Sequence, residues 1–103
     1  MTYIKIDNTL YPTVSIVGYM IDGKWDNRES KEITMESTYE DVKALMVDGI
    51  EWSIVERADD SEAESEYDNS EFNLSGAITD HRDGTVTIKM GKMTDLEEVL
   101  MML

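Results

Sequence analysis

A β-hairpin signature in the last third of the chain constrains its fold more than any other feature. The dipeptide Asp83-Gly84 separates two segments, 77–82 and 85–90, that are rich in β-branched residues. Asp-Gly between such segments is typical of a tight type I′ turn, because glycine adopts the positive φ that this turn requires. Every second residue of segment 85–90 is apolar and therefore faces one side. The pattern predicts an antiparallel sheet with one apolar face.

Other short segments carry the pattern of strands. Segment 13–21 is almost continuously apolar, which indicates a largely buried strand, and Pro12 confines the stretch before it to an edge. Residues 24–31 are polar apart from one tryptophan, and we expect them to form a loop. The remaining strand segments alternate apolar and polar residues, and they cover residues 3–6, 32–36 and 50–55.

Two segments show the helical spacing of apolar residues. In residues 39–48 the apolar positions recur three or four apart, Ser37 or Thr38 is placed to cap the start, and Gly49 is placed to end the helix. In residues 95–103, Thr94 and Glu97 form a capping box. The apolar stripe of this second helix consists of Leu96, Val99, Leu100 and Leu103.

These segments define the fold class. A chain of 103 residues with 41% hydrophobic residues predicts one domain, over residues 1–103, with a modest core. We expect an α+β fold, a mostly antiparallel sheet of five to seven short strands with the helices at about 39–48 and 95–103 on one face. For the methionine-rich C-terminal helix two interpretations stay open, packing on its own sheet or against a second subunit as a homo-oligomer.

The chain is strongly acidic, with 23 acidic and 9 basic residues and a net charge of −14. This charge argues against direct binding to nucleic acid or to an anionic membrane, since both need clustered cations. It leaves two interpretations, a well-solvated surface or a surface that binds a basic protein partner. Acids on the folded faces, Glu36, Glu40 and Asp41 among them, would then contribute to that surface.

Half of the net charge lies in residues 56–71, which hold eight acids and one base. Few large apolar side chains occur there, so we expect a mobile acidic loop at about 57–67. If the charge binds a partner, this stretch and Trp25 are the candidate binding residues, because tryptophan is frequent in binding hot spots. Trp25 is equally typical of a core residue at a strand end. The acids are Glu56, Asp59, Asp60, Glu62, Glu64, Glu66, Asp68 and Glu71.

The sequence offers little for catalysis. It has no cysteine and one histidine, His81, whose neighbour Asp80 would point to the opposite face of a strand. Neither of the common glycine-rich phosphate-loop motifs occurs, and the acidic stretch lacks the glycine and glutamate spacing of a calcium loop. We therefore expect no enzyme activity, no catalytic residue, no metal and no cofactor. No apolar run approaches the roughly 18 residues of a membrane span.

Several segments resemble small acidic proteins encoded by prophages of gut Firmicutes. They are residues 6–12, 25–31, 67–71 and 76–85. In size and charge the chain is also similar to anti-CRISPR inhibitors, some of which resemble DNA in charge pattern.

This resemblance implies a non-enzymatic phage protein that acts in the cytoplasm of the bacterial host. Its expected function is to inhibit a host nucleic-acid-binding protein, such as a CRISPR effector nuclease, by occupying the basic nucleic-acid groove. The alternative is a phage tail or tail-assembly component that self-associates through strand edges and the methionine-rich helix.

Overall fold

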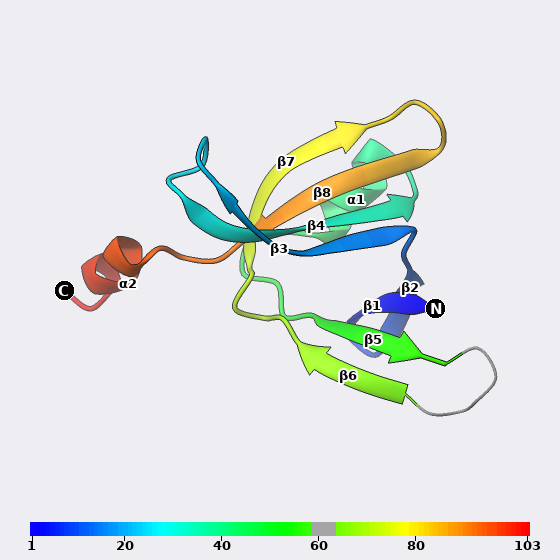
Figure 1. The fold of residues 1–103 in the computed structure, drawn as a ribbon, viewed down its shortest axis with the longest axis horizontal. Coiled ribbons are helices and arrows are strands. Elements are labelled where there is room, and N and C mark those ends of the chain that lie inside the picture. The colour runs from blue at the N-terminus through cyan, green and yellow to red at the C-terminus, as the bar shows by residue number, and fades with distance from the viewer. Residues whose placement is uncertain (59–63) are drawn as a thin grey trace.

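The computed structural model describes residues 1–58 and 64–103, and it folds them into two antiparallel sheets with two short helices (Figure 1). The α+β class is confirmed. The described residues form eight strands, slightly more than the five to seven expected. Within these residues, no helix combines the length and the apolar character needed to cross a membrane.

The first sheet has the strand order β2-β1-β5-β6 and joins the start of the chain to its middle. Strand β1 pairs antiparallel with β2 on one side and with β5 on the other. Strand β6 pairs with β5 and forms an edge. The bounds are β1 Thr2–Ile6, β2 Thr9–Pro12, β5 Ser53–Arg57 and β6 Glu64–Asp68.

The second sheet has the order β3-β4-β8-β7 and contains the predicted hairpin. Its strand β3 was expected to be largely buried but is mostly exposed, because it lies at the edge of the sheet. Asp80 pairs with Val86, so the connection is longer than a two-residue turn, and positive φ occurs at Arg82 and Gly84. The type I′ prediction is therefore wrong in detail. The Asp83 side chain accepts a hydrogen bond from the Thr85 amide (2.9 Å), which stabilises the wider turn. The bounds are β3 Ser15–Asp22, β4 Arg28–Glu36, β7 Leu74–Asp80 and β8 Thr85–Gly91.

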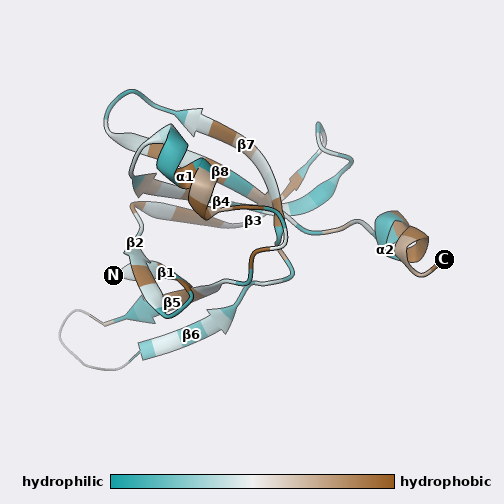
Figure 2. Cartoon of the chain, turned by 180° about the vertical axis from the view of Figure 1, so that it is seen from behind, coloured by the Kyte–Doolittle hydropathy of each residue, from teal (hydrophilic) through white to brown (hydrophobic). Residues whose placement is uncertain are grey.

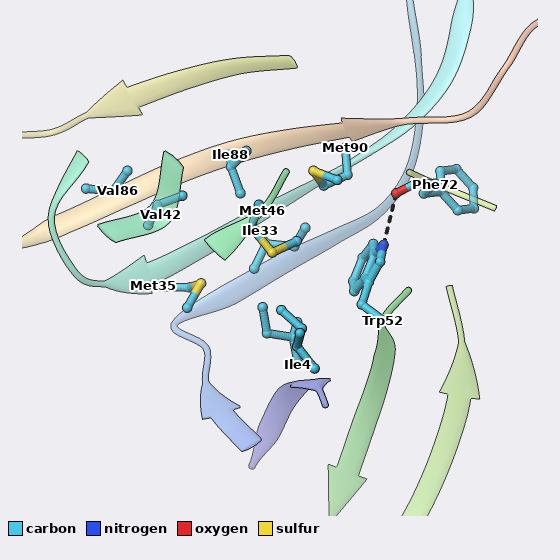
Figure 3. Close-up of a cluster of buried hydrophobic side chains, with 11 residues drawn as sticks. Ile4, Ile33, Met35, Val42, Met46, Trp52, Phe72, Val86, Ile88 and Met90 are labelled. Carbon is cyan, nitrogen blue, oxygen red and sulfur yellow. Dashed lines mark hydrogen bonds between the residues drawn. The ribbon is translucent and has the colours of Figure 1, made fainter. Parts of the chain in front are cut away.

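The core lies between the two sheets and helix α1 (Tyr39–Leu45) (Figure 3). Trp52, just before β5, is its largest buried side chain, and its indole Nε1 donates to the Phe72 carbonyl oxygen (2.9 Å). Sheet and helix contribute apolar side chains at the spacing that the sequence predicted. The buried residues of this cluster are Ile4, Ile6, Ile33, Met35, Val42, Met46, Trp52, Phe72, Val86, Ile88 and Met90.

Two predicted loops contain strand residues instead. Strand β4 begins at Arg28, inside the expected loop 24–31, because its early residues pair with both β3 and β8. In the expected mobile loop 57–67, Arg57 belongs to β5 and residues 64–67 belong to β6, so the loop prediction is wrong there. Backbone pairing with β5 orders this polar segment. Its sequence lacks the alternation of apolar and polar residues from which strands were predicted. Residues 59–63 lie outside the described part.

Helix α2 (Asp95–Met101) does not pack on the sheets, contrary to expectation. It projects from the end of the molecule on a short connection after β8 (Figure 1). No residue of α2 is buried. Its periodicity predicted an apolar stripe correctly, but the tertiary structure leaves that stripe uncovered.

Candidate functional site

The predicted acidic stretch falls on the β5–β6 hairpin and the turn after it. Glu56 lies on β5, Glu64, Glu66 and Asp68 lie on β6, and Glu71 lies in the turn. All five are exposed. The other predicted acids, Asp59, Asp60 and Glu62, lie outside the described residues.

Most of the described acids of this stretch have internal partners. Arg57 Nη2 lies 2.7 Å from Glu64 Oε2, and this hydrogen bond raises the pKa of Arg57. Lys5 Nζ lies 3.1 Å from Glu66 Oε1. Glu71 faces Lys92 at 3.7 Å and is the main cause of the raised pKa of that lysine. Three of the five described acids of this stretch are therefore engaged in ion pairs.

Asp68 has a structural role in the turn after β6. Its carboxylate accepts hydrogen bonds from the Ser70 hydroxyl (2.6 Å) and amide (3.1 Å). These contacts lower the pKa of Asp68, the hydroxyl contact most. The same turn positions Asn69, whose backbone amide donates to the Trp52 carbonyl oxygen (2.9 Å). Asp68 is thus held by the fold and still exposed.

A second group of acids gathers at one end of the second sheet, and we call it the acidic end. It lies where β4 ends, α1 begins and the β7–β8 turn closes (Figure 1). The Ser37 amide donates to the Gly84 carbonyl oxygen (3.2 Å), which joins these segments. The acidic end consists of Glu36, Glu40, Asp41, Asp80 and Asp83.

The acids of the acidic end differ from those of β6 in their partners. All five are exposed, and within residues 1–58 and 64–103 none of them forms a salt bridge. Lys43 and Arg82 are the cations nearest to them in the sequence, so the local charge stays negative. The sequence indicates three of these acids as part of a candidate surface, whereas Asp80 and Asp83 join them only through the hairpin register.

Trp25 lies in the β3–β4 connection and packs against glycines of β7 and β8. A Cβ atom at Gly76 or Gly91 would come within 2.7 Å of the Trp25 ring, so only glycine leaves room for it there. The guanidinium of Arg28 lies 4.8 Å from the ring centroid. Trp25 is half-buried by this packing, and its predicted role in partner binding stays a prediction.

A polar cluster ties the start of α2 to β4, and we call it the Arg28 clamp. Arg28 is 3% exposed and binds Glu97 with two hydrogen bonds, of 2.5 and 2.9 Å. It also donates to the Lys92 carbonyl oxygen (2.9 Å). Glu97 completes the predicted capping box with Thr94. The Arg28 contact, and after it the bond from the Thr94 amide, lowers the pKa of Glu97 to about 2.

The apolar side chains of α2 and of the two residues after it are exposed. Figure 2 shows the end of the chain coloured as hydrophobic. We call this surface the α2 apolar end. Its exposed fractions are 69% for Leu96, 56% for Val99, 58% for Leu100, 74% for Met101, 86% for Met102 and 96% for Leu103. The helix is held by polar contacts at its start and by no buried residue of its own.

The one histidine, His81, contacts the side chain of a neighbouring strand. The His81 ring nitrogen Nε2 lies 2.7 Å from the Thr87 hydroxyl, at an exposed strand end. In the described part of the chain, no group of three or more His, Cys, Asp or Glu side chains is placed to hold a metal ion.

Comparisons with known proteins identify no family for this chain. No protein-family model matches it, and neither a curated protein nor a solved structure matches it.

Proposed function

We propose that the protein is a non-enzymatic acidic binding protein that occupies a basic nucleic-acid groove on another protein. A CRISPR effector nuclease in the cytoplasm of a bacterial host is the partner class to test first. The proposal rests on the acidic end, where five exposed carboxylates lack salt bridges to the described residues. The net charge of −14 supports it.

The partners of the carboxylates favour the acidic end over β6 as the main contact. The charge of an acid that already faces Lys5 or Arg57 is partly offset by that cation, so its net attraction to a basic partner is small. Within the described residues, the acids of the acidic end have no such paired cation. A concentrated negative surface also accelerates encounter with a basic groove, and this effect weakens steeply with salt.

The test compares two triple variants that remove the same charge. E36Q/E40Q/D41N neutralises three acids of the acidic end, and E64Q/E66Q/E71Q neutralises the three ion-paired acids. Each changes the net charge from −14 to −11. We expect the first to weaken binding at least tenfold and the second to weaken it much less. Equal losses would show that only overall charge matters and would contradict this assignment.

The binding partner is identified by pull-down from host lysate at increasing salt, followed by mass spectrometry. A basic nuclease that elutes between about 0.1 and 0.5 M salt, and that its own nucleic acid competes off, supports the proposal. Recovery of phage tail proteins through salt-resistant contacts would overturn it in favour of a structural component. For the two triple variants described above, far-UV circular dichroism checks that the fold is intact.

A further inference from the structure

The α2 apolar end is used neither by the core nor by the proposed function. From Val99 onward the described chain has five consecutive apolar residues and no charged side chain. Helical segments that are apolar all round are buried in assembled proteins, because water does not stabilise such a surface. Exposed patches of this kind mark interaction sites.

We propose that the α2 apolar end is the self-complementary interface of a homodimer, in which two copies pack their α2 helices against each other. The occupant of each copy's surface is the same surface of the second copy, related by a twofold axis. This inference goes beyond the proposed function and does not depend on it, because it uses no residue of the acidic end.

The exposed area agrees with the requirement of a dimer. Fully burying a large apolar side chain corresponds to roughly 100 Å², so the six exposed side chains offer about 400 Å² of apolar surface per copy. Interfaces are about 60% apolar, so an interface that contains about 400 Å² of apolar surface from each copy would bury roughly 700 Å² in all on that copy. Standard interfaces bury about 800 Å² on each partner. The surface therefore suffices for a dimer at the weaker end of the stable range.

The charges of α2 are arranged so that two copies can meet. Its acids, Asp95, Glu97 and Glu98, all lie in the first turn, and Glu97 is neutralised by Arg28. Residues 99–103, which follow these acids, contain no charged side chain. Two copies of this segment can therefore meet apolar surface to apolar surface with the acids at the rim, where physiological salt screens repulsion between charges more than about 8 Å apart.

The clamp presents this surface in a defined orientation. Arg28 holds the first turn of α2 to the start of β4, and the helix extends away from both sheets (Figure 2). A helix that is already positioned loses less conformational freedom on association than an unattached segment does. Methionine side chains at positions 101 and 102 adapt their shape to a second copy.

The test is sedimentation velocity of the full chain over about 1–300 µM, a range that reaches the weak end of such interfaces. The variants are L100D and, as a matched control, I21D on the exposed edge strand β3. Both parent side chains are 58% exposed, so each variant adds one charge at an equally exposed site. Unchanged circular dichroism and thermal unfolding at low concentration establish that both variants fold, and M102D repeats the test at a second position.

We expect the wild type and I21D to dimerise with similar dissociation constants. In L100D and M102D the dissociation constant of the dimer should be at least tenfold higher. Raising the salt should strengthen the wild-type dimer, because it screens the repulsion between two acidic copies. A wild type that stays monomeric at 300 µM would overturn the proposal. So would a dimer that I21D disrupts and L100D leaves unchanged, since the interface would then be the β3 edge. Neither outcome bears on binding by the acidic end.

Discussion

Helices α1 and α2 begin alike and end in opposite environments. Each has seven residues and an N-terminal threonine whose hydroxyl accepts a backbone hydrogen bond, at 3.1 Å in α1 and 3.3 Å in α2. The apolar stripe of α1 includes Val42 (1% exposed) and reaches Met46 (0%), which caps the helix. The stripe of α2 buries nothing.

The difference arises from the place in the fold where each helix starts. Helix α1 leaves β4 at the Gly84 turn and lies back across the second sheet, where its stripe contacts β7 and β8. Helix α2 leaves β8 at the far end of that sheet, and the Arg28 clamp fixes its start there. Helical periodicity therefore shows that a face is apolar, whereas the position of the helix start decides whether the protein itself covers that face.

The largest expected effect is the difference between the two apolar stripes in their contribution to the free energy of unfolding. M46A should lower the free energy of unfolding by about 2–5 kcal/mol, because it leaves a cavity in the core. L100A should change it by less than about 0.5 kcal/mol in the monomer, since surface substitutions cost little. Urea unfolding at low protein concentration measures both values. A large loss in L100A would mean that α2 packs against its own chain.

The second prediction removes the clamp. R28M keeps the apolar stem beside Trp25 and removes the bonds to Glu97, so we expect hydrogen exchange in α2 to accelerate roughly tenfold. Exchange in α1 should stay unchanged, because its position depends on apolar packing. K24M, an exposed lysine in the same β3–β4 connection, is the control. If α2 keeps its protection in R28M, another contact holds it.

The third prediction compares the two N-caps. T38A should cost about 1 kcal/mol of global stability, because α1 unfolds with the core. T94A removes a hydrogen bond of the same kind, but its cost should appear only as local fraying of α2. Urea unfolding measures the first effect and amide exchange the second. Equal global losses would show that α2 and the core unfold as one unit.

The smallest effect concerns pH. The pKa of Glu97 is lowered from 4.5 to about 2, so the carboxylate stabilises the folded arrangement above pH 4.5 and loses this contribution as the pH falls through about 2. An NMR titration of the Glu97 carboxyl carbon should give a midpoint near 2. In R28M the midpoint should rise toward 4.5, because the main cause of the lowered pKa is gone. A midpoint near 4.5 in the wild type would mean that the clamp does not form in solution.

The candidate sites show where sequence reasoning reaches its limit. The acids of residues 56–71 stand out as a concentrated charge, but the pattern does not show that Glu66 meets Lys5, which lies 61 positions away. The same holds for Arg28 and Glu97, which are 69 positions apart. Hairpin pairing brings Asp80 and Asp83 to the acidic end. Local spacing identifies which side chains are charged, and only the pairing of distant segments decides which charges are neutralised.

By itself the sequence determined the local elements of this protein. The capping box of Thr94 and Glu97, the apolar face of β8 and the start of both helices depend on interactions within four residues, whose geometry every helix or strand repeats. The tertiary structure decided that β6 exists, that α1 is covered and that α2 is not. These outcomes depend on contacts between segments far apart in the chain, which no local period encodes.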